Sequence, residues 1–214
     1  MNNTVSMTFV RRISEKYESR RRKTSVSASR LGSGFTLIEL VVVITIIGIL
    51  ASVALPRFVN MQRDARIAKL NAVRGAVGAA SALIHAALLA HQGPDTAVCP
   101  GTAVTAQNAL TGASTVCTEN GIVATQDGYP RVTDTALFDG VTTPGIVGAA
   151  GLTSQFNPTT AELTSEGYEV LGAGGVQTIR ILGAPTPATC SFTYTQPVIV
   201  NAAALTSSVV TTGC

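Results

Sequence analysis

The sequence is poor in charged and in aromatic residues. Charged residues make up 13% of the 214 positions, aromatic residues 5%, and there is no tryptophan, whereas hydrophobic residues reach 46%. A freely soluble cytosolic enzyme does not fit so little charge, so part of the apolar surface must be hidden outside an ordinary core. The length leaves room for one domain of ordinary size plus an appendage.

Basic charge is missing from most of the chain. The first 34 residues hold eight Lys and Arg against two acidic residues, so the rest carries more acidic than basic residues despite a formal net charge of +3. After residue 90 the only Lys or Arg residues are Arg131 and Arg180, against eight acidic ones. Because polyanion binding needs clustered cations on the folded part, we do not expect nucleic acid as a partner.

Catalytic and cofactor-binding motifs are also missing. The sequence has no nucleophile elbow, no HExxH pair and no phosphate-binding loop. We therefore predict that the protein is not an enzyme and needs no cofactor. His85 and His91 are six residues apart, which places them on different faces of a helix, so a shared metal is not expected. We interpret both as ordinary polar positions.

One long apolar run stands out from the rest of the chain. Residues 35 to 55 contain a single charge, Glu39, and a helix of that length covers roughly 30 Å, the thickness of a bilayer core. The run continues directly into a helical pattern, unlike a secretory signal peptide with its small-residue cleavage site. Because the Lys and Arg residues precede it, residues 1 to 34 stay in the cytoplasm and the C-terminal part crosses the membrane.

Helical periodicity continues beyond the apolar run. We predict one long helix to about residue 90, kinked at Pro56, which lacks a backbone donor, and stopped by Gly93 and Pro94. Four cations beside its apolar stripe are interpreted as a solvated or intersubunit face, with binding to anionic lipid or DNA as alternatives: Arg63, Arg66, Lys69 and Arg74. The stripe itself comprises Phe58, Met61, Ala65, Ala68, Ala72, Ala76, Ala79, Leu83, Ala87 and Ala90.

The remaining residues form short β-type runs in a Thr-, Gly- and Ala-rich background. Strands are predicted at 121–125, 128–133, 167–171, 175–182, 190–195 and 197–201, with a linker-like stretch at 139–161. The predicted fold is α+β, a long N-terminal α-helix whose first half spans the membrane, packed through its stripe against a small antiparallel β-sheet. The predicted parts are residues 1–34, 35–56, 57–92 and a β-rich head at 93–214.

All four cysteines lie in the part predicted to be translocated, where disulfides persist. Four cysteines allow three connectivities. We favour neighbour pairing, which closes the shortest loops by joining Cys99 to Cys117 and Cys190 to Cys214. Loops of about 20 residues each add roughly 3 kcal/mol in the chain-entropy model. Zinc ligation would need tighter spacing, so no metal site is predicted.

A carboxylate five residues into a membrane span needs an explanation. Thr36 and Glu39 fit a capping box, in which the Glu39 carboxylate only satisfies the first amides of its own helix. The alternative is a cut between Gly34 and Phe35, which creates an α-ammonium that can pair with Glu39 of a neighbouring chain inside an apolar bundle.

The segment GFTLIELVVVITIIGIL, followed by Pro56, resembles the class III leader junction and N-terminal helix of type IV pilins and type II secretion pseudopilins. The resemblance implies that a membrane-embedded prepilin peptidase cuts after Gly34 and methylates the amine of Phe35. It also implies that Glu39 guides docking of subunits and that the apolar helices bundle as a filament core. The stretch after residue 53 and the Cys-bounded end from residue 188 are similar to mannose-sensitive haemagglutinin (MSHA) type pilins, within type IVa.

The resemblance implies a structural subunit of a type IV pilus that serves adhesion, surface attachment or motility. Its partners would be prepilin peptidase, other pilin subunits, the inner-membrane assembly machinery and, before assembly, membrane lipid. The precursor would cross the inner membrane once, with a periplasmic head, and the assembled pilus would be extracellular. The alternatives are a pseudopilin or a minor, ligand-binding adhesin pilin. Major pseudopilins resemble one another in an acidic calcium loop near the C-terminus, whereas no acidic residue follows Glu169 here, which favours the pilin.

Overall fold

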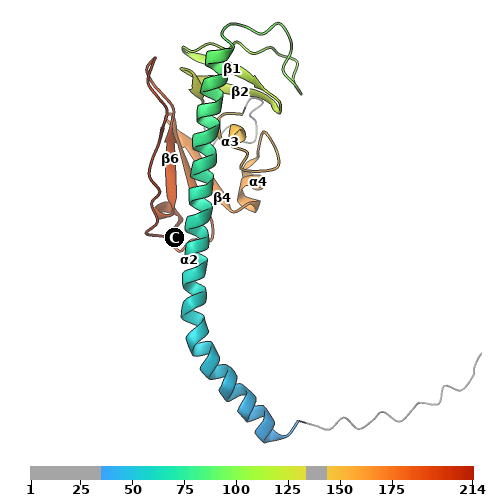
Figure 1. The fold of residues 1–214 in the computed structure, drawn as a ribbon, viewed down its shortest axis with the longest axis vertical. Helices are drawn as coiled ribbons and strands as arrows, with labels where there is room; N and C mark the ends of the chain where they lie inside the picture. Colours follow the sequence, from blue (N-terminus) through green and yellow to red (C-terminus); the bar gives the residue numbers. More distant parts are fainter. Residues whose placement is uncertain (1–34, 134–143) are drawn as a thin grey trace, which may run out of the picture. The chain divides into compact units, whose positions relative to one another are not determined.

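The computed structural model describes residues 35–133 and 144–214, and the predicted leader at 1–34, with Gly34, lies outside them (Figure 1). The chain divides into two units, Met1–Ser52 and Val53–Cys214. The first unit contributes the beginning of helix α2, and the second contributes the rest of that helix and the β-rich head.

Helix α2 runs from Leu37 to Ala90, 54 residues without interruption. It confirms the predicted long helix. Pro56 lies inside the helix rather than at its end, so one backbone hydrogen bond is lost there, and a bend at this residue stays a prediction. The N-terminal part of α2 is long and apolar enough to cross a membrane, and no part of its most apolar window is buried within the chain.

The head contains two antiparallel sheets, which confirm the α+β class. The first has the order β1-β2-β3, from Ala113–Thr118, Gly121–Gln126 and Tyr129–Pro130. The second has the order β4-β5-β6-β7, from Tyr168–Ala173, Val176–Ile181, Ser191–Thr195 and Leu205–Thr206. In the part of the head that the structure describes, short helical segments also lie between the strands: α3 Ile146–Ala149, α4 Thr160–Ser165 and η2 Pro187–Thr189.

Strands β2 to β6 fall within or beside the predicted runs, but the run at 197–201 is not a strand. It forms an exposed loop in which Val198 is 77% exposed and Asn201 has a φ of 67°. Pro197 removes a donor there, and the residues after it, 198–201, are exposed. Strand β1 and strand β7 were not predicted, because small and polar residues dominate the first and the second is only two residues long.

The apolar stripe predicted for the second half of α2 is wrong. Phe58, Met61 and Leu83 of that stripe are 61%, 64% and 70% exposed. The face that packs against the head lies roughly a third of a turn away and comprises Leu70, Val73, Val77, Ala80, Ser81, Ile84 and Leu88. The larger aliphatic side chains on this face bury more apolar area than the alanine row does, which decides the side on which the sheets pack.

The two sheets use different parts of this buried face. Leu70 to Ala80 pack with residues of β4, β5 and β6, including Val170, Ile179 and Phe192. Ile84 and Leu88 pack with Val116 and Val123, which lie opposite each other on β1 and β2. The sheets therefore follow one another along α2, as Figure 1 shows.

The four cations expected on a solvated or intersubunit face contact the head of the same chain. Arg63 and Arg74 are also exposed, as a solvated face requires, and a role between subunits stays a prediction. Arg66 Nη1 donates to the backbone oxygen of Cys214 at 2.8 Å, and Arg74 Nε to that of Ser207 at 2.7 Å. Lys69 Nζ donates to the Glu166 carbonyl and lies 4.1 Å from the centre of the Tyr168 ring. Arg63 makes a longer contact, 3.5 Å from the Thr211 oxygen.

Two disulfides close loops in the head. Cys99 is joined to Cys117, and Cys190 is joined to Cys214, across 18 and 24 residues of sequence. This is the neighbour pairing among the three possible connectivities. The second disulfide holds the C-terminal segment beside β6, on the same segment that Arg66 and Arg74 contact.

Candidate assembly site at the start of helix α2

The first turn of α2 presents apolar side chains and one carboxylate to the surroundings. Phe35 is 79% exposed and precedes the helix, while Leu37 and Ile38 in its first turn are equally uncovered. Glu39 is exposed in the same turn. Nothing in the described part of the chain covers this end of the helix, so these side chains are available to lipid or to another chain.

Thr36 caps the helix with its hydroxyl. The Glu39 backbone N–H donates to Thr36 Oγ1 at 3.3 Å, and the Leu40 N–H donates to the Thr36 carbonyl at 3.2 Å. A complete capping box also needs the Glu39 carboxylate to accept from the Thr36 backbone N–H. Among residues 35–133 and 144–214, no hydrogen bond or ion pair to that carboxylate is present.

The Glu39 carboxylate is therefore a charge without a partner inside an apolar segment. In water or at a membrane surface it is hydrated, but surrounded by Leu, Val and Ile side chains an unpaired carboxylate costs several kcal/mol. A cation supplied from outside the described residues removes most of that cost.

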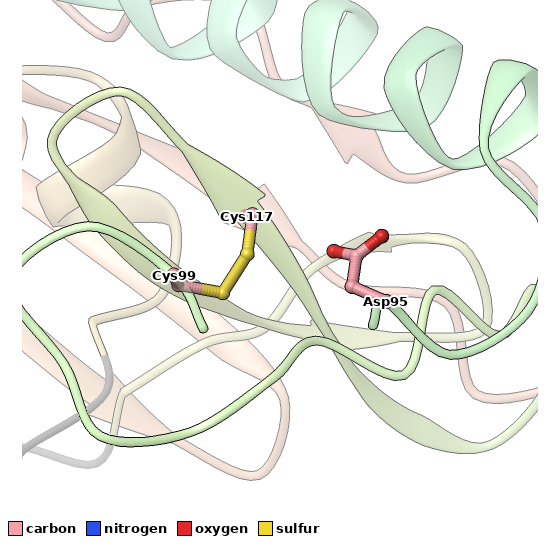
Figure 2. Close-up of side chains that lie close together, drawn as sticks. All are labelled: Asp95, Cys99 and Cys117. Atoms are coloured by element: carbon pink, nitrogen blue, oxygen red, sulfur yellow. A yellow bond between two sulfur atoms is a disulfide. The ribbon is translucent and has the colours of Figure 1, made fainter. Parts of the chain in front are cut away.

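The other predicted site residues lie apart from this end. Pro56 is inside α2, and the four cysteines are in the head as disulfides. Asp95 lies close to Cys99 and Cys117, and Figure 2 shows the yellow bond between the two sulfur atoms. A metal would need cysteine thiolates, which a disulfide does not provide, so this cluster is not a metal site.

His85 has a structural role that the sequence did not reveal. Its ring stacks on Tyr129 with centroids 4.2 Å apart and 4° between the planes, and Nδ1 lies 2.8 Å from the Gly128 carbonyl. The His85 ring thus packs α2 against β3. His91 is exposed just beyond the end of α2, and the two histidines do not share a site.

Asp127 is a second polar position that sequence reasoning missed. Gln126 Nε2 donates to Oδ2 at 2.9 Å and the Gly112 N–H donates to Oδ1 at 2.6 Å. These bonds to the charged form lower the pKa of Asp127 below its ordinary value. The Asp-Gly pair at 127–128 is a turn signal between two apolar runs, and it could have indicated this position.

A comparison with known protein families found a match at this end of the chain. The family described as the prokaryotic N-terminal methylation motif matches residues 30–55. A curated relative, the type IV narrow pilus major component PilA5 of Thermus thermophilus, is 52% identical over 50 residues. This match covers 23% of the present chain and 43% of the relative. No solved structure matches the chain.

The motif and the apolar helix define the class of proteins made as precursors with an N-terminal methylation signal. Within that class, the matched segment, including its leader junction, is similar to the type IV pilin family. This is a family of structural proteins rather than enzymes. The family match ends at residue 55, and the MSHA-type resemblance of the later segments is not among these findings.

Proposed function

We propose that the protein is a structural subunit of a type IV pilus filament. The observation that carries the proposal is the end of α2, where an exposed apolar helix carries one carboxylate without a partner in the described residues. Bundled copies would bury the apolar surface of each helix, and the carboxylate would then need a cation from a neighbour.

The proposal includes processing by prepilin peptidase. The enzyme cuts between Gly34 and Phe35, outside the folded head, and methylates the new amine of Phe35. The motif match spans this junction, and the described helix begins two residues after Phe35. The freed ammonium of one subunit pairs with the Glu39 carboxylate of the next and sets the axial position at which subunits dock.

Before assembly the precursor crosses the inner membrane once, with residues 1–34 in the cytoplasm and the head in the periplasm. The inner-membrane assembly machinery then moves it from lipid into the filament. The disulfides of the head fit an oxidising compartment outside the cytoplasm. The filament would serve adhesion, surface attachment or motility, in the manner of MSHA-type pili.

A type II secretion pseudopilin is the second candidate, because its N-terminal helix follows the same pattern. No acidic residue follows Glu169, so the C-terminal segment lacks the carboxylates that a calcium loop would need. This favours the pilus subunit. A minor pilin that acts as an adhesin is a variant of the same proposal.

Two measurements test the proposal. Mass spectrometry of the cell-associated protein should give a mature N-terminus at methylated Phe35, and Gly34→Glu should leave uncut precursor in the membrane. Immunogold electron microscopy should place the head on surface filaments. A chain that keeps residues 1–34, or label confined to the cell envelope, would contradict the pilus assignment.

A further inference from the structure

The part of α2 between the apolar run and the head is not covered by other described residues of its own chain. Residues 55–65 are all exposed, and the side-chain hydrogen bonds from the described part of α2 to the head begin at Arg63. We refer to residues 55–62 as the neck. It contains four large apolar side chains, between 61% and 66% exposed: Leu55, Phe58, Val59 and Met61.

The neck is amphipathic. At 100° per residue, its four large apolar side chains fall within an arc of about 160°, which Gln62 shares. Arg57 and Asn60, together with Asp64 and Arg63 in the next turn, occupy the opposite side. Arg57 has no hydrogen bond or ion pair to any other described residue. A helix divided in this way fits a boundary between an apolar and an aqueous medium.

The length of the exposed apolar helix determines where along the helix the bilayer core ends. From Phe35 to Met61 the contour is about 39 Å at 1.5 Å per residue, whereas the hydrocarbon core is about 30 Å thick. With Phe35 at the cytoplasmic face, the bilayer core ends near the neck even when the helix is tilted. The neck therefore coincides with the headgroup region of the opposite leaflet.

We propose that the neck is an interfacial anchor that binds phospholipid in the periplasmic leaflet before assembly. Phe58, Val59 and Met61 lie at the boundary between headgroups and acyl chains, and Arg57 directs its guanidinium to lipid phosphate. The anchor strengthens the membrane attachment that the spanning helix provides, and it sets the distance between the head and the membrane. The inference deepens the proposed function, because it concerns the precursor of the same subunit.

The test uses the absence of tryptophan from the chain, because one introduced tryptophan then reports on one position. The full chain is reconstituted in vesicles of phosphatidylcholine and phosphatidylglycerol, with bromine on the lipid chains at shallow, middle or deep positions. Phe58→Trp and Met61→Trp should show blue-shifted emission, quenched most by shallow bromine. Asn60→Trp, on the polar side of the same turn, should be quenched less.

Leu83→Trp is the matched control on the same helix, because Leu83 is 70% exposed but lies at the level of the head. Its emission should be red-shifted and insensitive to bromine. Adding Arg57→Gln to Phe58→Trp should move the quenching maximum towards deeper bromine, since the contact to phosphate is lost.

Three results would overturn the anchor. Emission of Phe58→Trp that matches Leu83→Trp would place the neck in water. Blue-shifted emission without quenching would mean that a second copy of the chain, not lipid, covers it. Strongest quenching by deep bromine would make the neck part of the span itself. Because no filament forms in these vesicles, each result is independent of the test of pilus assembly.

Discussion

Helices α2 and α4 begin with the same pattern, Thr-x-x-Glu, at residues 36–39 and 159–162, but the two glutamates are used differently. In α4 the box is complete. Glu162 N donates to Thr159 Oγ1, and Glu162 Oε2 accepts from the Thr159 N–H at 2.8 Å and from its hydroxyl at 3.0 Å. In α2 only the hydroxyl half is present, and the Glu39 carboxylate has no partner among the described residues.

The difference shows that a capping pattern does not settle the role of its carboxylate. Helix α4 belongs to the head, with Leu163 buried in the core, so its cap completes a local structure. The start of α2 has no core beside it in the described part of its own unit, and its carboxylate remains available to another chain. Four substitutions break or sharpen this comparison.

The largest effect is expected for Glu39→Ala. We expect insertion and cleavage to proceed, while filaments are lost or become rare when this is the only subunit present, because no carboxylate pairs with the neighbouring ammonium. Filaments per cell are counted by electron microscopy. Glu162→Ala is the matched control and should leave filament numbers near normal. Equal losses in both variants would contradict the difference between the two caps.

A smaller effect is expected for Thr159→Ala in α4. Loss of the cap should lower the free energy of unfolding of the head by about 1 kcal/mol, because a helix N–H loses its acceptor. Urea unfolding followed by circular dichroism measures this. Glu166→Ala serves as control, since Lys69 contacts the backbone carbonyl at that residue and not its side chain. An unchanged midpoint for Thr159→Ala would mean that the box contributes no stability.

Thr36→Ala should have a slighter effect still on the protein as a whole. It removes the 3.3 Å hydrogen bond from Glu39 N and costs up to about 1 kcal/mol of local helix stability, but it leaves the carboxylate in place. Filament counts should remain close to those of the unmodified protein. If Thr36→Ala and Glu39→Ala reduce filaments equally, the carboxylate acts only as part of a cap.

The smallest effect is expected for Asp127, whose carboxylate accepts hydrogen bonds within the head, and this effect disappears in acid. Because its folded pKa lies below the ordinary value, the stability that it contributes is present above the unfolded pKa of about 3.9 and is lost as the pH falls through the lower folded pKa. Asp127→Asn should therefore be less stable than the unmodified head near neutral pH, and the gap should narrow below about pH 4.

Chemical unfolding at a series of pH values measures the difference in free energy of unfolding between the unmodified protein and Asp127→Asn. Glu119→Gln, at an exposed position between β1 and β2, is the control. A gap that stays constant from neutral to acid pH would show that the bonds from Gln126 and Gly112 do not depend on the charge of Asp127.

Much of the fold followed from the sequence because its signals are local. The apolar run at 35–55 and the helical period beyond it predicted α2, and the β-type runs predicted most strands. The predicted junction at Gly34 and Phe35, with Glu39, rests on one contiguous motif and stays a prediction. The incomplete box at Glu39 could not be predicted, because Thr36-x-x-Glu39 and Thr159-x-x-Glu162 are alike as patterns.

The sequence by itself determined what depends on neighbours along the chain, namely where the apolar helix lies. The leader junction and the membrane orientation rest on the same kind of local signal and stay predictions. Only the tertiary structure decided which face of α2 is buried, that Arg66, Lys69 and Arg74 contact their own head, and that His85 stacks on Tyr129. The reason is physical. Several faces of α2 are apolar enough to pack, and the choice between them rests on the summed contacts with strands far away in sequence, which periodicity along one helix does not contain.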